Sequence, residues 1–148
     1  MSATGGSELS AKEERDAAEK KRVAAKQERD AAEQKRDTAE QKRVAAEQKR
    51  DAAKQEQDAA FEKLQSAKND QEHNSAEDIQ MLKQRYEDAR AVFLGAQAAL
   101  DGAQAALDDA QTALRSAQAT YDEAQRLVSQ LELQRTFSRC FLAVVVVL

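Results

Sequence analysis

The sequence predicts an all-α protein whose two long helices form an antiparallel, alanine-rich coiled-coil hairpin, and we expect such hairpins to pair into a helical bundle. The chain of 148 residues has no proline, 34% charged residues and only 4% aromatic residues, a composition typical of long helices and coiled coils. Two long stretches repeat every seven residues, and a short polar segment separates them near the middle of the chain. A compact enzyme fold is therefore not expected.

The first repeat starts at Arg15 and predicts one helix over residues 10–68. Its seven-residue units are RDAAEKK, RVAAKQE, RDAAEQK, RDTAEQK, RVAAEQK, RDAAKQE and QDAAFEK. Ala, Glu, Gln, Lys and Arg are strong helix formers, and no helix-breaking residue interrupts the units. Ser10 and Glu13 have the spacing of a capping box at the start of this helix. Residues 1–9 are expected to be disordered.

One face of this helix carries a narrow stripe of alanines, and most of the alternate core positions hold arginine. Burying a methyl group contributes only about 0.8 kcal/mol, so the helix is expected to need a partner. A ladder of alternating charges at steps of four and three, such as Arg29, Glu33 and Arg36, gives roughly 0.2–0.5 kcal/mol of local support for each pair. The residues predicted to face the partner helix are Ala32, Ala39, Ala46, Ala53, Ala60 and Leu64.

Residues 69–75 are predicted to form a polar turn, because Asn, Asp and Ser side chains cluster there and compete with helical hydrogen bonds. Ser75 is expected to cap the second helix, which we place at residues 76–136. Apolar residues in that helix alternate at spacings of three and four, which predicts a sustained coiled-coil seam. Its larger members are Ile79, Leu82, Tyr86, Phe93, Leu100, Leu107, Leu114, Tyr121, Val128 and Leu131.

The two predicted helices are nearly equal in length, and a short link between such helices favours an antiparallel hairpin. The expected register places Ala53 opposite Ala89 and Phe93. A parallel dimer through the first helix is the rival arrangement, but it brings like charges together at most facing positions. A second apolar row beside the seam widens the buried face and favours a bundle of three or four helices; it consists of Val92, Ala99, Ala106, Ala113 and Leu127.

No catalytic, cofactor-binding or metal-ligating residues are predicted from this sequence. Paired carboxylates such as Asp108 and Asp109 lie on a helix without the desolvated pocket that acid–base catalysis needs. The chain has one histidine and one cysteine, which excludes the usual zinc ligand sets and a disulfide framework. The segment from Asp70 lacks the glycine and glutamate of a calcium-binding EF-hand loop. Basic and acidic residues are interleaved, so nucleic-acid binding is not expected.

Residues 137–148 form an apolar tail that ends in CFLAVVVVL. This tail is shorter than the stretch of about 20 residues that a membrane-spanning helix requires. Three interpretations remain open: a hydrophobic plug or strand added to a partner, the start of a membrane span, and a shallow membrane anchor. In the third, Arg135 and Arg139 meet lipid headgroups, and Cys140 is the site of lipid attachment.

The alanine-rich heptads resemble, in composition, the stalk helices of bacterial envelope-spanning proteins and colicins, and their Ala, Lys, Glu and Gln content is similar to that of stress-protective embryogenesis proteins. The leading hypothesis is a non-enzymatic structural protein, a spacer or oligomerising scaffold that associates with itself or with other coiled-coil proteins. The alternatives are a peripheral membrane protein held by residues 137–148 and a conditionally folded stress protectant. A reducing, cytoplasmic compartment is the default expectation for a chain without a disulfide framework.

Overall fold

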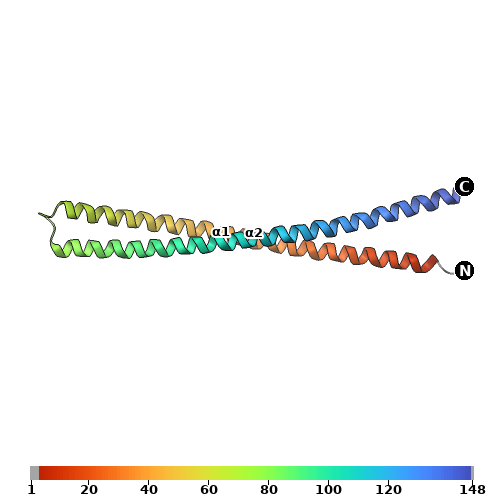
Figure 1. Cartoon of the computed structure of the whole chain (residues 1–148), viewed down its shortest axis with the longest axis horizontal. Coiled ribbons are helices and arrows are strands. Elements are labelled where there is room, and N and C mark those ends of the chain that lie inside the picture. The colour runs from red at the N-terminus through yellow and green to blue at the C-terminus, as the bar shows by residue number, and fades with distance from the viewer. Residues whose placement is uncertain (1–3, 148) are drawn as a thin grey trace. The chain divides into compact units, whose positions relative to one another are not determined.

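The computed structural model describes the backbone of residues 4–147 and the side chains of residues 9–141. It contains helix α1 (Thr4–Asn69) and helix α2 (Ala76–Val147), which are joined by a turn at residues 70–75 (Figure 1). No strand occurs among the described residues. The two helices pack against each other, so the all-α helical hairpin predicted from the sequence is confirmed.

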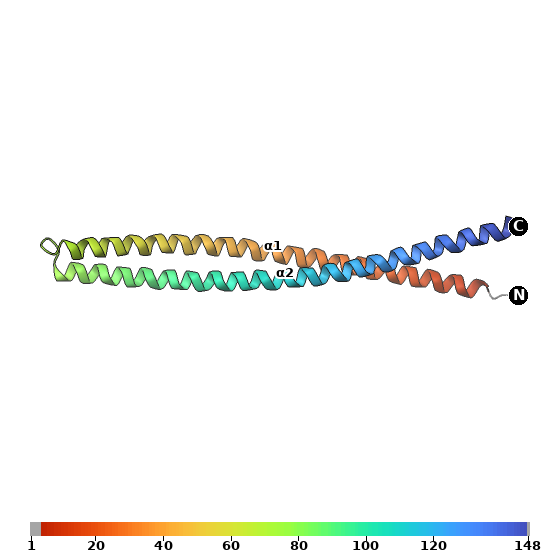
Figure 2. The same ribbon diagram turned by 45° about the horizontal axis from the view of Figure 1, so that its top comes forward.

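The hairpin consists of two units, which we describe separately. The turn unit spans Arg36–Asp109 and contains the turn, and the terminal unit combines Met1–Lys35 with Ala110–Leu148. Within the turn unit, α1 and α2 run antiparallel and lie side by side in both views (Figures 1 and 2). Each unit therefore contains one length of each helix.

The turn is held by hydrogen bonds around Asp70. The Asp70 carbonyl accepts from the backbone N–H of His73 at 3.2 Å and from the side-chain amide of Asn74 at 2.9 Å. The Asp70 carboxylate lies 2.8 Å from Nδ1 of His73. No residue in the described part of the chain has a positive φ. These hydrogen bonds thus stabilise a reversal of the chain direction that contains no glycine, as expected for a cluster of Asp and Asn.

A reciprocal cap starts α2. The backbone N–H of Asp78 donates to the Ser75 hydroxyl at 3.1 Å, and the backbone N–H of Ser75 donates to the Asp78 carboxylate at 3.2 Å. The Ser75 hydroxyl also donates to this carboxylate at 2.6 Å. These hydrogen bonds lower the pKa of Asp78 below its ordinary value. The arrangement is a capping box with aspartate at its third position, and the prediction of Ser75 as the N-cap is confirmed.

Both helices extend beyond the bounds expected from the sequence. Helix α1 begins at Thr4, so Ser10 and Glu13 lie inside it and do not form its start. Helix α2 continues past residue 136 and through the apolar tail to Val147. The physical reason is that β-branched residues cost only a few tenths of a kcal/mol each in a helix, while adding a residue to an existing helix is far easier than nucleating one.

The aromatic contact nearest the turn is consistent with the expected register. The ring centroids of Phe61 and Tyr86 lie 5.5 Å apart in the turn unit. The expected register, in which Ala53 lies opposite Ala89 and Phe93, places Phe61 opposite Leu82 and Tyr86 when it is continued to this level.

The core is thin in both units. The buried apolar residues are Ala18, Ala25, Ala53, Leu64, Ala67, Leu107 and Val128. Among the described residues no polar or charged residue is buried, and no side chain is completely enclosed. Most of the helix pairing therefore rests on half-buried residues.

Candidate helix–helix interface

The residues that are buried or half-buried between α1 and α2 are called the seam here. Of the residues that the sequence places in it, Ala53, Leu64, Leu107 and Val128 are buried. The others are half-buried: Ala32, Ala39, Ala46, Ala60, Ile79, Leu82, Tyr86, Phe93, Leu100, Leu114, Tyr121 and Leu131. On α1 the buried alanines Ala18, Ala25 and Ala67 continue the same row. The seam thus follows the three-and-four spacing of the sequence in each unit.

Arginines occupy the alternate seam positions of α1, and each is half-buried: Arg15, Arg22, Arg29, Arg36, Arg43 and Arg50. Arg29 bonds to the aspartate that follows it, with its Nη2 2.7 Å from Asp30 Oδ1. The same neighbouring pair forms between Arg36 and Asp37 and between Arg50 and Asp51. The sequence reasoning missed these pairs, because it considered only partners three or four residues away. The feature of the sequence that could have indicated these pairs is the recurring dipeptide Arg-Asp.

Two of the seven-residue repeats carry valine after the arginine, where most of the others carry aspartate, and the arginine has a different partner in these two repeats. Beside Val23, Arg22 pairs with Glu19. Beside Val44, Arg43 pairs with Glu47 at 3.2 Å, which is one of the ladder pairs predicted from the sequence. Each of these guanidinium groups is therefore partnered within its own helix, so it can enter the seam without an uncompensated charge.

Arginine side chains also make contacts across the terminal unit. Arg22 donates from Nη1 to Gln125 Oε1 at 3.4 Å. The guanidinium carbon of Arg29 lies 4.6 Å from the centre of the Tyr121 ring, which is a cation–π contact. The hydrogen bond to Asp30 raises the pKa of Arg29 above its ordinary value, so this cation remains charged at every working pH. Long basic side chains therefore cover the seam where α1 offers only alanine.

Two aromatic side chains meet in the turn unit. Phe61 and Tyr86 lie at an interplanar angle of 51°, a tilted geometry that suits the ring quadrupoles. Leu64, one helical turn from Phe61, is only 4% exposed. The sequence prediction grouped these residues near the turn, and the structure brings Phe61 and Tyr86 into contact.

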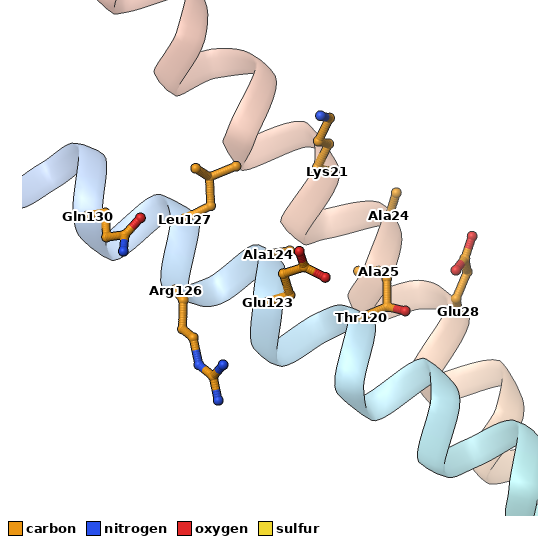
Figure 3. A pocket seen from close by; sticks show the side chains of 10 residues that line it. All are labelled: Lys21, Ala24, Ala25, Glu28, Thr120, Glu123, Ala124, Arg126, Leu127 and Gln130. Carbon is orange, nitrogen blue, oxygen red and sulfur yellow. The ribbon is translucent and has the colours of Figure 1, made fainter.

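A groove runs along one side of the seam in the terminal unit (Figure 3). It has a volume of about 580 Å³ and is lined by Lys21, Ala24, Ala25 and Glu28 of α1 and by Thr120, Glu123, Ala124, Arg126, Leu127 and Gln130 of α2. Ala25 is buried, and Leu127 is 38% exposed. Figure 3 shows the Leu127 side chain directed toward α1. The groove therefore combines an apolar floor of small residues with charged rims.

The described part of the apolar tail is exposed. Phe137 and Phe141 are each 74% exposed, and Cys140, which lies between them in the sequence, is exposed with a free thiol. The side chains of residues 142–148, on which part of the tail prediction depends, lie outside the described residues. Within the part that the structure describes, no helix has the length and apolar character required to cross a membrane.

The seam consists of apolar side chains and paired charges. Among the described residues, no group of three or more His, Cys, Asp or Glu side chains is placed to hold a metal ion. Nor does the described part contain a buried side-chain nitrogen or oxygen without a hydrogen-bond partner.

No protein-family model, curated protein or solved structure matches this chain.

Proposed function

We propose that this chain is a non-enzymatic structural protein, a coiled-coil hairpin that associates with itself and serves as a spacer or oligomerising scaffold. The observation that carries the proposal is the seam of each unit, in which most of the larger side chains remain half-exposed. In a finished core such side chains are fully enclosed. Association of hairpins encloses them without any change in the helices.

The exposed apolar side chains support the same proposal. They include Val92 and Leu94 in the turn unit and Leu127 in the terminal unit. Covering such apolar area is the main source of association energy between helices.

Sedimentation and thermal melting test this proposal together. In reducing buffer, which prevents Cys140 from forming a disulfide between two chains, the sedimenting mass should correspond to two or more chains. The melting temperature, followed by circular dichroism at 222 nm, should rise with protein concentration, because association stabilises the folded state by mass action. A monomer whose melting temperature is independent of concentration contradicts the proposal. A chain that is largely unfolded in dilute buffer supports the stress-protectant alternative instead.

A second function is favoured by one specific observation, the exposed aromatic pair near the C-terminus. Phe137 and Phe141 are four residues apart and so lie on one face of α2, while Arg135 and Arg139 stand beside them in the sequence. Exposed aromatics with neighbouring basic residues are typical of helices that lie in a membrane interface. We therefore propose, as the alternative, a peripheral membrane protein anchored through residues 137–148.

Flotation with anionic vesicles separates the two functions. The full chain and a chain ending at residue 136 are compared, together with the variant Phe137→Ser, Phe141→Ser. Loss of flotation in both altered chains supports the membrane-surface function. Equal flotation of all three chains, or none in the full chain, contradicts it and leaves the scaffold proposal unaffected.

A further inference from the structure

The groove of the terminal unit has charged rims that differ between its two ends. The Arg22–Gln125 hydrogen bond fixes which residues of the helices lie at the same level. Because α1 and α2 run antiparallel, the lining residues divide into two ends. The end nearer the chain termini carries Lys21 and Arg126, and the end nearer the turn carries Glu28 and Glu123. One end of the groove is thus basic and the other is acidic.

These four charged residues are available to a partner. All of them are exposed. Within the described part of the chain, none of the four has a hydrogen-bond or ion-pair partner through its side chain, unlike Arg22 and Arg43 of the seam. Two copies related by a two-fold axis across the groove place the basic end of each opposite the acidic end of the other. An isologous interface requires this kind of self-complementarity.

The apolar residues of the groove match the same arrangement. Leu127 lies at the level of Lys21 and projects beside the seam as a partly exposed knob. Toward the acidic end, Ala24, Ala25 and Ala124 leave a shallow floor of methyl groups. The two-fold axis that pairs the charges also brings the leucine of one copy over the alanine floor of the other. A large side chain set among small ones is the packing by which helices interlock.

From this pattern we infer that the groove between Lys21 and Gln130 is the site at which a second copy of the chain docks, antiparallel to the first. The inference rests on the proposed scaffold function and specifies its interface. The leucine supplies the apolar anchor, and the four rim charges set the direction and the level of docking. Docking in the opposite direction brings like charges together and is disfavoured.

Charge reversal tests the docking directly. One variant, Glu28→Lys with Glu123→Lys, makes the whole groove basic, and a second, Lys21→Glu with Arg126→Glu, makes it acidic. Each variant alone should associate at least about tenfold more weakly than the wild type at low salt, because four exposed ion pairs become repulsive. An equimolar mixture of the two should associate again. A chain carrying all four reversals should also recover, since its groove has two opposite ends once more.

A matched control has the same net charge as the basic variant but leaves the groove intact: Glu72→Lys with Glu87→Lys, both exposed positions of the turn unit. Helicity at 222 nm verifies that every variant folds. The apolar anchor is tested by Leu127→Ala, which should weaken association at high as well as low salt, because the apolar contribution is not screened.

The results separate docking at the groove from self-association through some other surface. Weakened single variants with recovery in the mixture support docking at the groove. If the wild type associates and the groove variants weaken it no more than the control, the groove is not the interface, while the scaffold proposal stands. If the wild type is monomeric at every concentration, both are overturned.

Discussion

Truncation of Leu107 tests how much of the hairpin's stability comes from the seam. Leu107 is 6% exposed, so Leu107→Ala removes about three buried methylene equivalents at about 0.8 kcal/mol each, or about 2.4 kcal/mol. A residual cavity adds to this cost when the surroundings cannot collapse. The seam is open to water along both sides, so we expect the free energy of unfolding to fall by about 2–3 kcal/mol, at the lower end of the range for buried leucines.

Leu94 provides the matched control on the same helix and in the same unit. It is 55% exposed, so less than half of its side chain is covered on folding. The same calculation gives about 1 kcal/mol for Leu94→Ala. Burial measured against an extended chain is an upper bound, so the difference between the two leucines is the more reliable quantity. We expect Leu107→Ala to cost at least twice as much as Leu94→Ala.

Urea unfolding followed at 222 nm measures both values, with the protein concentration held constant because the proposed association would contribute to the apparent stability. The slope of the free energy against urea concentration should be unchanged in both variants, which separates a loss of packing from a change in the unfolded state. Equal destabilisation by the two substitutions would show that the seam is not where the helices derive their stability.

Three further predictions follow from local geometry. The pKa of Asp78 is lowered in the folded chain, so its stabilising contribution is complete above the ordinary aspartate pKa and is lost as the pH falls through the lowered value; Asp78→Asn should remove this part of the acid dependence in melts from about pH 2 to pH 7. A double-mutant cycle on Phe61 and Tyr86 should give a coupling energy of about 0.5–1.5 kcal/mol, and a coupling near zero would count against their ring contact. In a chain freed of its native cysteine, cysteines replacing Ala46 and Leu100 should form a bridge within one chain, because the expected register, with which the Phe61–Tyr86 contact is consistent, brings these positions to about the same level; failure of this pair under oxidising conditions contradicts the register.

The helices and their seam were predictable because the information is local and periodic. Apolar residues at spacings of three and four mark one face of a helix wherever they occur. This spacing identified Leu107 and Val128 as core residues without any knowledge of their partner. The cap at Ser75 was predictable for a similar reason, since a serine that ends a polar cluster has a hydrogen-bonding role within a few residues of itself.

The register and the arginine pairs depend on choices that the repeat leaves open. A seam that recurs every three or four residues matches its partner at several neighbouring levels, so the pattern groups Phe61 with both Leu82 and Tyr86 and does not say which of them its ring contacts. Arg29 has acidic residues both next to it and four positions away, and the spacing alone did not point to its hydrogen bond with Asp30. The groove was hidden for the same reason, because its lining comes from two segments whose alignment the sequence does not determine.

The position of the aromatic contact near the turn has a consequence for the order of folding. Phe61 and Tyr86 are separated by about 25 residues of chain, whereas Arg22 and Gln125 are separated by 103. Closing the longer loop directly costs about 1.3 kcal/mol more in chain entropy, and its contact contains no large apolar pair to offset that cost. Pairing should therefore start beside the turn and proceed toward the chain ends, each step closing only a short additional loop. The terminal unit is then the last part to form and the first to open, which makes it the part whose lifetime a docked second chain would lengthen most.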